Sequence, residues 1–124
     1  MIPRLRAWDK EFKEMVQVDA LVFDEQIIKA TYKNGNVVKE DLKNYVLMQS
    51  TGLKDKNGKE IFEGDIIDST DGFLTGVIEF RVSLGMFVSD LVEYNSFERL
   101  CNVASSRKII GNIWEHPELA EVSS

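Results

Sequence analysis

The sequence has few of the residues from which catalytic and metal sites are usually built. Its 124 residues include one cysteine, Cys101, and one histidine, His116. A single cysteine excludes an internal disulfide and is typical of a reducing compartment. A structural zinc site needs about four cysteine or histidine ligands, so structural zinc is excluded as well. From cysteine usage we predict a cytoplasmic protein. We also expect no metal site and no cofactor.

Long apolar runs are also missing. The longest span only residues 20–23 and 45–48, whereas a helix needs about 20 apolar residues to cross a bilayer. The charged residues near Met1 have no apolar stretch behind them, as a signal peptide would require. The sequence therefore predicts neither membrane contact nor secretion.

The common catalytic motifs are absent. No Gly-x-Gly-x-x-Gly or phosphate-binding loop occurs, and no Gly-x-Ser-x-Gly elbow. A Cys101–His116 pair acting as nucleophile and base stays an alternative. However, Cys101 beside Leu100 and Val103 is more typical of packing, and His116 before Pro117 of a surface position. We predict that the protein is not an enzyme and has no catalytic residues.

Two acidic stretches resemble metal sites at first sight. Residues 55–60 begin like a calcium-binding loop, but the fifth, sixth and twelfth positions hold Lys59, Glu60 and Ile66 instead of a ligand, a glycine and a glutamate. An Asn57-Gly58 turn is the better interpretation.

The second acidic stretch is a cluster of four carboxylates, which in principle suits Mg²⁺ binding or acid–base catalysis. In a strand that begins at Asp65, successive side chains alternate between faces, so Asp65 and Asp68 point to opposite sides. We interpret the cluster as solvated turn residues. Its members are Glu63, Asp65, Asp68 and Asp71.

The net charge of −6 comes from 15 basic and 21 acidic residues. Residues 63–98 hold only Arg81 as a base among many acids, and such a segment would repel a phosphate backbone. Nucleic-acid binding is therefore disfavoured. It remains the alternative function through a basic and aromatic N-terminal segment, although acidic residues are interleaved there. That segment contains Arg4, Arg6, Trp8, Lys10 and Lys13.

Closely spaced turn signals predict a β-rich fold. Asn34-Gly35, Asn57-Gly58 and Asp71-Gly72 separate short segments rich in valine, isoleucine and phenylalanine. In residues 78–82 the apolar side chains alternate with charged ones, as in a half-buried strand. The predicted strands span residues 5–8, 15–22, 27–32, 45–49, 65–68, 76–82, 86–91 and 108–114. Short helices are expected at residues 39–44, 96–100 and 117–122.

We therefore predict a mainly β protein with one to three short helices. A small barrel of the SH3 type is expected over roughly residues 60–115, with a strand-rich N-terminal extension. Residues 1–50 would form a segment for self-association and residues 51–124 the barrel domain with a short C-terminal tail. A single domain over residues 1–124 is the alternative.

Three stretches resemble the YopX family of phage and prophage proteins: residues 6–10, residues 47–67 and residues 109–119. Small departures are Ser50, Trp114 and His116. The resemblance implies a small, β-rich, intracellular protein encoded by a phage or prophage, and an oligomer. It implies no activity and no site residues.

The functional prediction combines these observations. We expect a non-enzymatic protein-interaction or oligomeric module in the cytoplasm of the bacterial host, forming a homo-oligomer or binding an unidentified host or phage protein. The alternative is the nucleic-acid-binding accessory factor described above.

Overall fold

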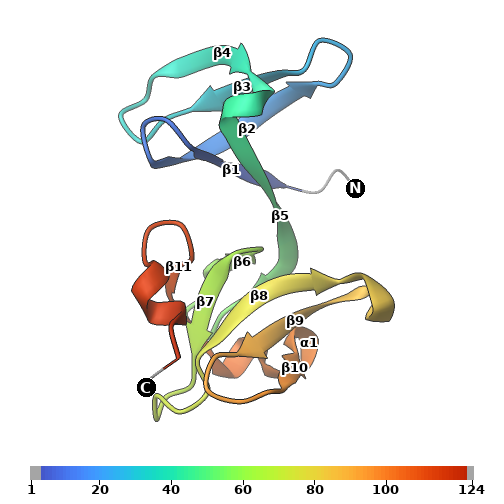
Figure 1. Cartoon of the computed structure of the whole chain (residues 1–124), viewed down its shortest axis with the longest axis vertical. Coiled ribbons are helices and arrows are strands. Elements are labelled where there is room, and N and C mark those ends of the chain that lie inside the picture. Colours follow the sequence, from blue (N-terminus) through green and yellow to red (C-terminus); the bar gives the residue numbers. More distant parts are fainter. Residues whose placement is uncertain (1–3, 123–124) are drawn as a thin grey trace. The chain divides into compact units, whose positions relative to one another are not determined.

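The computed structural model describes residues 4–122 and divides the chain into two compact units, Met1–Gln49 and Ser50–Ser124 (Figure 1). The mainly β prediction is confirmed, because the chain forms two antiparallel sheets of six and five strands. The strand β5 (Tyr45–Lys54) belongs to both units: its first half pairs with β1 and its second half with β6.

The N-terminal unit is an antiparallel sheet with the strand order β4-β3-β2-β1-β5, in which β1 to β4 form a meander and β5 returns to pair with β1. Its remaining strands are β1 (Leu5–Asp9), β2 (Glu14–Val22), β3 (Ile27–Thr31) and β4 (Val37–Asp41). The Asn34-Gly35 signal is confirmed as the β3–β4 turn, where Gly35 has a φ of 91° that favours glycine. Ala7, Val16 and Ile28 lie at the centre of the buried core.

The prediction of a helix at residues 39–44 is wrong. Most of it is the edge strand β4, and only Leu42–Asn44 form the 3-10 turn η1. The reason is tertiary, since β4 pairs along β3 with Val38 opposite Ala30. Asp41 then accepts a hydrogen bond from the backbone N–H of Lys43, which ends the strand.

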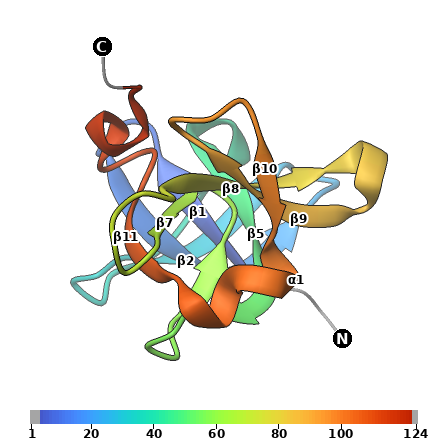
Figure 2. The ribbon, with the colours of Figure 1, turned by 90° about the horizontal axis from the view of Figure 1, so that it is seen from below.

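The C-terminal unit contains the second sheet, with the strand order β10-β9-β8-β7-β11 (Figure 2). The strands of this unit are β6 (Glu60–Phe62), β7 (Asp65–Asp68), β8 (Gly76–Arg81), β9 (Met86–Leu91), β10 (Phe97–Arg99) and β11 (Lys108–Asn112). Ile61, Ile67 and Ile78 pack with Leu100 and Ala104 in its core.

The SH3-like barrel is not confirmed. Closure of a sheet requires its two edge strands to pair, but within residues 4–122 the edges β10 and β11 do not pair with each other. β10 has only three residues, because the chain turns at once into a helix. The sheet β10-β9-β8-β7-β11 of the C-terminal unit is therefore open.

The helices are shorter than predicted. The expected helix at residues 96–100 is mostly strand β10, followed by the single turn α1 (Leu100–Val103) and the 3-10 turn η3 (Ala104–Ser106). At the C-terminal end η4 (Pro117–Ala120) is again a 3-10 turn.

Among residues 4–122, no helix is both long and apolar enough to cross a membrane.

Candidate functional site

Three strands of the second sheet bring a small charged network together around Arg81. Its Nη2 donates to Oδ1 of Asp90 over 2.7 Å, and its Nε lies 3.5 Å from Oε1 of Glu79. The guanidinium carbon lies 4.2 Å from the centre of the Phe97 ring, the geometry of a cation–π contact. Because Asp90 pairs with Phe97 across β9 and β10, the sheet register itself places the ring beside the ion pair.

The network has more negative than positive charge. One guanidinium is shared by Glu79 and Asp90, and both it and Asp90 are about one-third exposed. Burial raises the pKa of Glu79, and the neighbouring Asp90 carboxylate raises that pKa further, while Arg81 opposes the shift. The arrangement therefore favours uptake of another positive charge.

An open cavity of about 460 Å³ adjoins this network on the β9–β10 side. Backbone hydrogen bonds from Leu91 to Ser96 (3.1 Å) and from Ser96 to Tyr94 (2.8 Å) shape the turn that forms its wall. The Tyr94 side chain is half exposed. The cavity is lined by Arg81, Asp90, Leu91, Tyr94, Asn95, Ser96 and Phe97.

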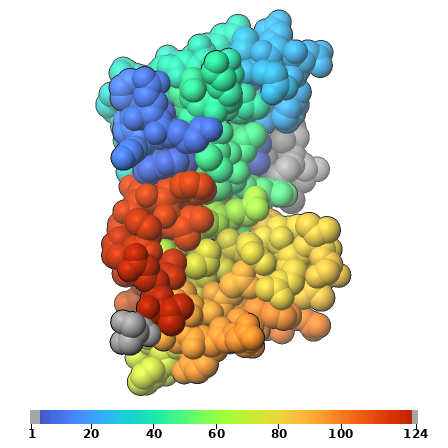
Figure 3. Space-filling view, viewed as in Figure 1, coloured from blue at the N-terminus to red at the C-terminus, as the bar shows by residue number. Residues whose placement is uncertain are grey.

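The far end of the β8–β9 hairpin carries exposed apolar side chains. Val82 is 83% exposed, Phe80 41% and Leu84 38%. The turn is η2 (Val82–Leu84), which extends away from the sheet in Figures 1 and 2 and lies on the surface shown in yellow in Figure 3. Phe80 packs edge-on against Phe87, with 5.1 Å between ring centres. We name Phe80, Val82 and Leu84 the hairpin patch.

The hairpin patch corrects the interpretation of residues 78–82 as one half-buried strand. Ile78 is buried in the core, but Phe80 and Val82 are exposed although they alternate with it in the sequence. The hairpin extends beyond the core, so its outer half stays exposed at Phe80, Val82 and Leu84.

Cys101 and His116 make separate contacts. Cys101 is exposed, and its Sγ lies 3.7 Å from Oδ1 of Asn102. Nδ1 of His116 accepts a hydrogen bond from the backbone N–H of Asn112 over 3.3 Å. Within residues 4–122 no hydrogen bond joins the two side chains, so the structure gives the nucleophile–base alternative no support.

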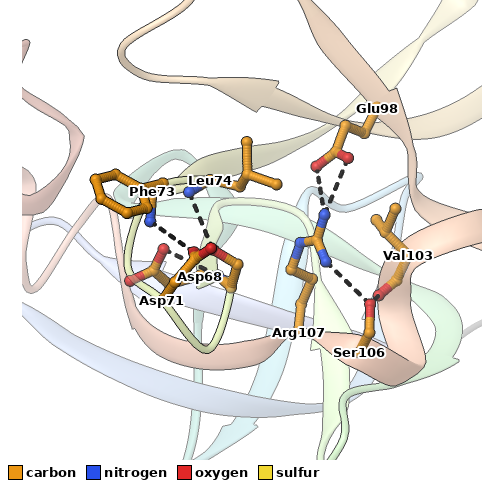
Figure 4. Close-up of polar contacts among 9 residues, drawn as sticks. Asp68, Asp71, Phe73, Leu74, Glu98, Val103, Ser106 and Arg107 are labelled. Carbon is orange, nitrogen blue, oxygen red and sulfur yellow. Dashed lines mark hydrogen bonds and ion pairs between the residues drawn. The ribbon is translucent and has the colours of Figure 1, made fainter.

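The acidic cluster fits the prediction of solvated turn residues only at Asp71, because Asp65 and Asp68 belong to strand β7 and Asp65 is buried. Oδ2 of Asp65 accepts from the backbone N–H of Phe62 over 2.8 Å. Asp71 accepts from the Ser69 hydroxyl over 2.5 Å and from the backbone N–H of Phe73 over 3.1 Å (Figure 4). These two hydrogen bonds lower the pKa of Asp71. In the described part of the chain, no group of three or more His, Cys, Asp or Glu side chains is arranged to hold a metal.

A buried ion pair lies near this cluster and has no sequence signal of its own. Nη2 of Arg107 donates to both carboxylate oxygens of Glu98 over 3.0 and 2.9 Å, and Nη1 donates to the Ser106 hydroxyl over 2.9 Å (Figure 4). Arg107 is only 9% exposed. The pair ties the β10 segment to the chain just before β11.

Trp8 lies inside the protein. The predicted basic and aromatic nucleic-acid segment includes this tryptophan, but it is 8% exposed within β1. Arg4 and Lys10 on either side are exposed. Arg4 and Lys10 are thus exposed to solvent, whereas Arg6 is partly buried and the aromatic ring of Trp8 is buried.

Comparison with known proteins gives a clear result. A family model described as YopX protein matches residues 4–121. The chain belongs to the YopX family. This YopX-family chain is similar to the crystal structure of protein EF1440 from Enterococcus faecalis, with 32% identity, a TM-score of 0.65 and coverage of 98% of this chain and 99% of that one.

The fold is also similar to the crystal structure of protein YopX from Bacillus subtilis. That chain is 23% identical, with a TM-score of 0.55 and full coverage of both chains. No curated protein matches the sequence. The resemblance predicted from three motifs is therefore confirmed.

The long central YopX motif, residues 47–67, contains a turn between β5 and β6 that is held by side-chain hydrogen bonds. Asp55 is buried, and its Oδ1 accepts from the backbone N–H groups of Asn57 and Lys59, both over 2.9 Å. Its Oδ2 accepts from the backbone N–H of Ile109 over 3.0 Å. This confirms a turn in place of a calcium loop and gives the motif a structural role, since one carboxylate joins the turn to β11.

The closing YopX motif, residues 109–119, contains a second turn held by side-chain hydrogen bonds, which follows β11. Oδ1 of Asn112 accepts from the backbone N–H groups of Trp114 and Glu115 over 3.0 and 2.9 Å. Gly111 leaves room for His116: a Cβ on Gly111 would lie 2.6 Å from Nδ1 and 2.9 Å from Cγ of that ring.

We expect Gly111→Ala to destabilise the protein, because the His116 ring must give way and its hydrogen bond from Asn112 is strained. The expected loss is about 1–2 kcal/mol of unfolding free energy, measured by urea denaturation. The double variant Gly111→Ala/His116→Ala should regain part of it. Equal losses in the single and double variants would contradict the steric explanation.

The Arg81 network and Tyr94 are not among the residues predicted from the sequence. One signal was available, since Arg81 is the single base among the acids of residues 63–98. A lone base in an acidic segment is a good candidate for an ion pair, but its partners are set by strand register.

Proposed function

We propose that this YopX-family protein is a non-enzymatic interaction module that self-associates through the hairpin patch. We further propose that it is encoded by a phage or prophage and acts in the cytoplasm of the bacterial host, as the family resemblance implies. The observation that carries the proposal is the exposure of Phe80, Val82 and Leu84 at the end of one hairpin. Adjacent exposed apolar side chains are typical of interaction sites.

A second copy of the chain is the occupant that fits this patch best. Two copies with a net charge of −6 repel each other, so a contact between them is favoured where charge is absent. Residues 82–89 contain no charged side chain. A two-fold symmetric contact places identical patches against each other, so one uncharged patch per copy is sufficient.

We expect Val82→Glu to weaken self-association, because it places two like charges at the centre of the contact. The measurement is sedimentation velocity over a concentration series. The wild type should exceed the monomer mass of 14.2 kDa, and the variant should require at least about tenfold higher concentration to associate, which is about 1.4 kcal/mol.

Phe23→Glu is the matched control, because Phe23 is also a strongly exposed apolar residue at a hairpin turn but lies in the N-terminal unit. It should leave the mass unchanged. If Phe23→Glu dissociates the oligomer and Val82→Glu does not, residues 1–50 mediate self-association and the patch assignment fails. A wild type that stays monomeric throughout contradicts the whole proposal.

The nucleic-acid alternative has less support. The buried Trp8 is not available for base stacking, and the acidic residues of the C-terminal unit repel phosphates. Salt-dependent retention of single-stranded DNA or RNA would revive it, and no binding at about 50 mM salt would end it.

A further inference from the structure

The cavity beside Arg81 is lined by both aromatic and acidic side chains, whereas the hairpin patch consists of apolar side chains alone. Its walls include the half-exposed Tyr94 ring and Phe97, while Asp90 supplies a carboxylate and Glu79 lies beside that carboxylate. Carboxylates beside aromatic faces are suited to organic cations, because an aromatic face attracts positive charge and carboxylates neutralise it.

Arg81 shows that the site already holds one guanidinium in this manner. Its guanidinium lies over the Phe97 ring at 4.2 Å and is paired to Asp90 at 2.7 Å. The chain thus contains an internal example of the contact that an external cation would make. Tyr94, which also lines the cavity, offers a second ring.

The charge balance favours a second cation over an anion. Arg81 is already shared by Glu79 and Asp90, so the three side chains together carry one net negative charge. An anion would have to compete with both carboxylates for Arg81. A cation reduces the repulsion between them instead.

We propose that the cavity formed by Arg81, Asp90, Tyr94 and Phe97 binds a lysine or arginine side chain from a basic segment of a partner protein. The cation lies between the Tyr94 ring and the Asp90 carboxylate. This inference deepens the proposed function, because it names the chemistry of a partner. Arg81 of the cavity stands between Phe80 and Val82 of the hairpin patch in the sequence, so the two proposals are tested with different variants and different measurements.

The experiment is an NMR titration of the ¹⁵N-labelled full-length protein with three short glycine–serine peptides. One peptide carries two arginines, the second two glutamines at the same positions, and the third two glutamates. We expect the arginine peptide to shift the amide signals of residues 90–97 and the other two to have no effect. Added salt should weaken the binding, since the site is exposed.

Two variants and two matched controls locate the site. Tyr94→Ala should weaken arginine-peptide binding about two- to fivefold, and Asp90→Asn by at least as much. Phe73→Ala removes another exposed ring, and Glu121→Gln another exposed carboxylate of the same unit. Both controls should bind as the wild type does, and unchanged core signals show that each variant is folded.

The proposal is overturned if the arginine peptide does not bind at about 10 mM, if the glutamate peptide binds more tightly, or if the controls weaken binding as much as the cavity variants. Self-association is measured independently by sedimentation. A monomeric protein that still binds the arginine peptide refutes the patch alone, and an oligomer that ignores the peptide refutes the cavity alone.

Discussion

Asp55→Ala should lower the free energy of unfolding by about 3 kcal/mol, the largest effect that we expect from any single polar substitution. The buried carboxylate accepts hydrogen bonds from the backbone N–H groups of Asn57, Lys59 and Ile109. Alanine leaves three donors without this acceptor, and an unsatisfied buried donor costs about 1–3 kcal/mol, less where water reaches it. Chemical denaturation measures the loss directly.

Lys56→Ala, at the exposed neighbouring position, is the control and should change stability by less than about 0.5 kcal/mol. Asp55→Asn should lie between the two, because it keeps one acceptor oxygen. A loss in Asp55→Ala no larger than in Lys56→Ala would show that the turn is held by its backbone alone.

The Asp55 carboxylate also makes the stability difference between the wild type and Asp55→Asn depend on pH. Burial by itself raises the pKa of Asp55, but the hydrogen bonds from Ile109, Lys59 and Asn57 outweigh it and the pKa is lowered. A carboxyl with a lowered pKa in the folded state contributes stability above its unfolded pKa of about 3.9, and loses it as the pH falls through the folded value. The stability difference between wild type and Asp55→Asn should therefore be constant near neutral pH and narrow below about pH 4.

Glu98→Ala is expected to have the next largest effect, a loss of about 2–3 kcal/mol. Arg107 is 9% exposed and donates to both oxygens of this carboxylate. Removal of one partner from a buried ion pair leaves a charge without compensation, which costs about 3–5 kcal/mol for a fully buried pair. The Glu98 side chain is 24% exposed, so water reduces the loss.

The control for this pair is a double variant. Glu98→Leu/Arg107→Met removes both charges and should be less destabilised than Glu98→Ala, because no buried charge remains alone. Glu121→Ala, at an exposed carboxylate, should have almost no effect. If Glu98→Ala is as stable as Glu121→Ala, Arg107 finds other partners and the ion pair is not needed.

Local signals predicted much of the fold. The strands at residues 65–68 and 86–91 have the predicted bounds, and the Asn34-Gly35 and Asn57-Gly58 turns lie where the sequence places them. These features depend on a few neighbouring residues: β-branched side chains favour extended backbone, and glycine accepts a positive φ.

Three strands were not predicted, at Val37–Asp41, Glu60–Phe62 and Phe97–Arg99. Each contains acidic or basic residues, two are only three residues long, and β4 and β10 lie at sheet edges. Their extended conformation comes from hydrogen bonds to a neighbouring strand and not from their own composition. Pattern analysis detects such segments poorly, because the partner strand is not part of the pattern.

The sites divide in the same way. From the sequence alone come the single cysteine and histidine, the net charge of −6 and the acidic segment around Arg81. The sequence also predicted the mainly β class and the YopX family, since these depend on composition and on contiguous motifs. The tertiary structure decided that Phe97 lies under Arg81, that Trp8 is buried and that the hairpin patch is exposed. Those outcomes depend on strand register and on how far the core extends, and both are settled only by contacts between residues distant in the chain.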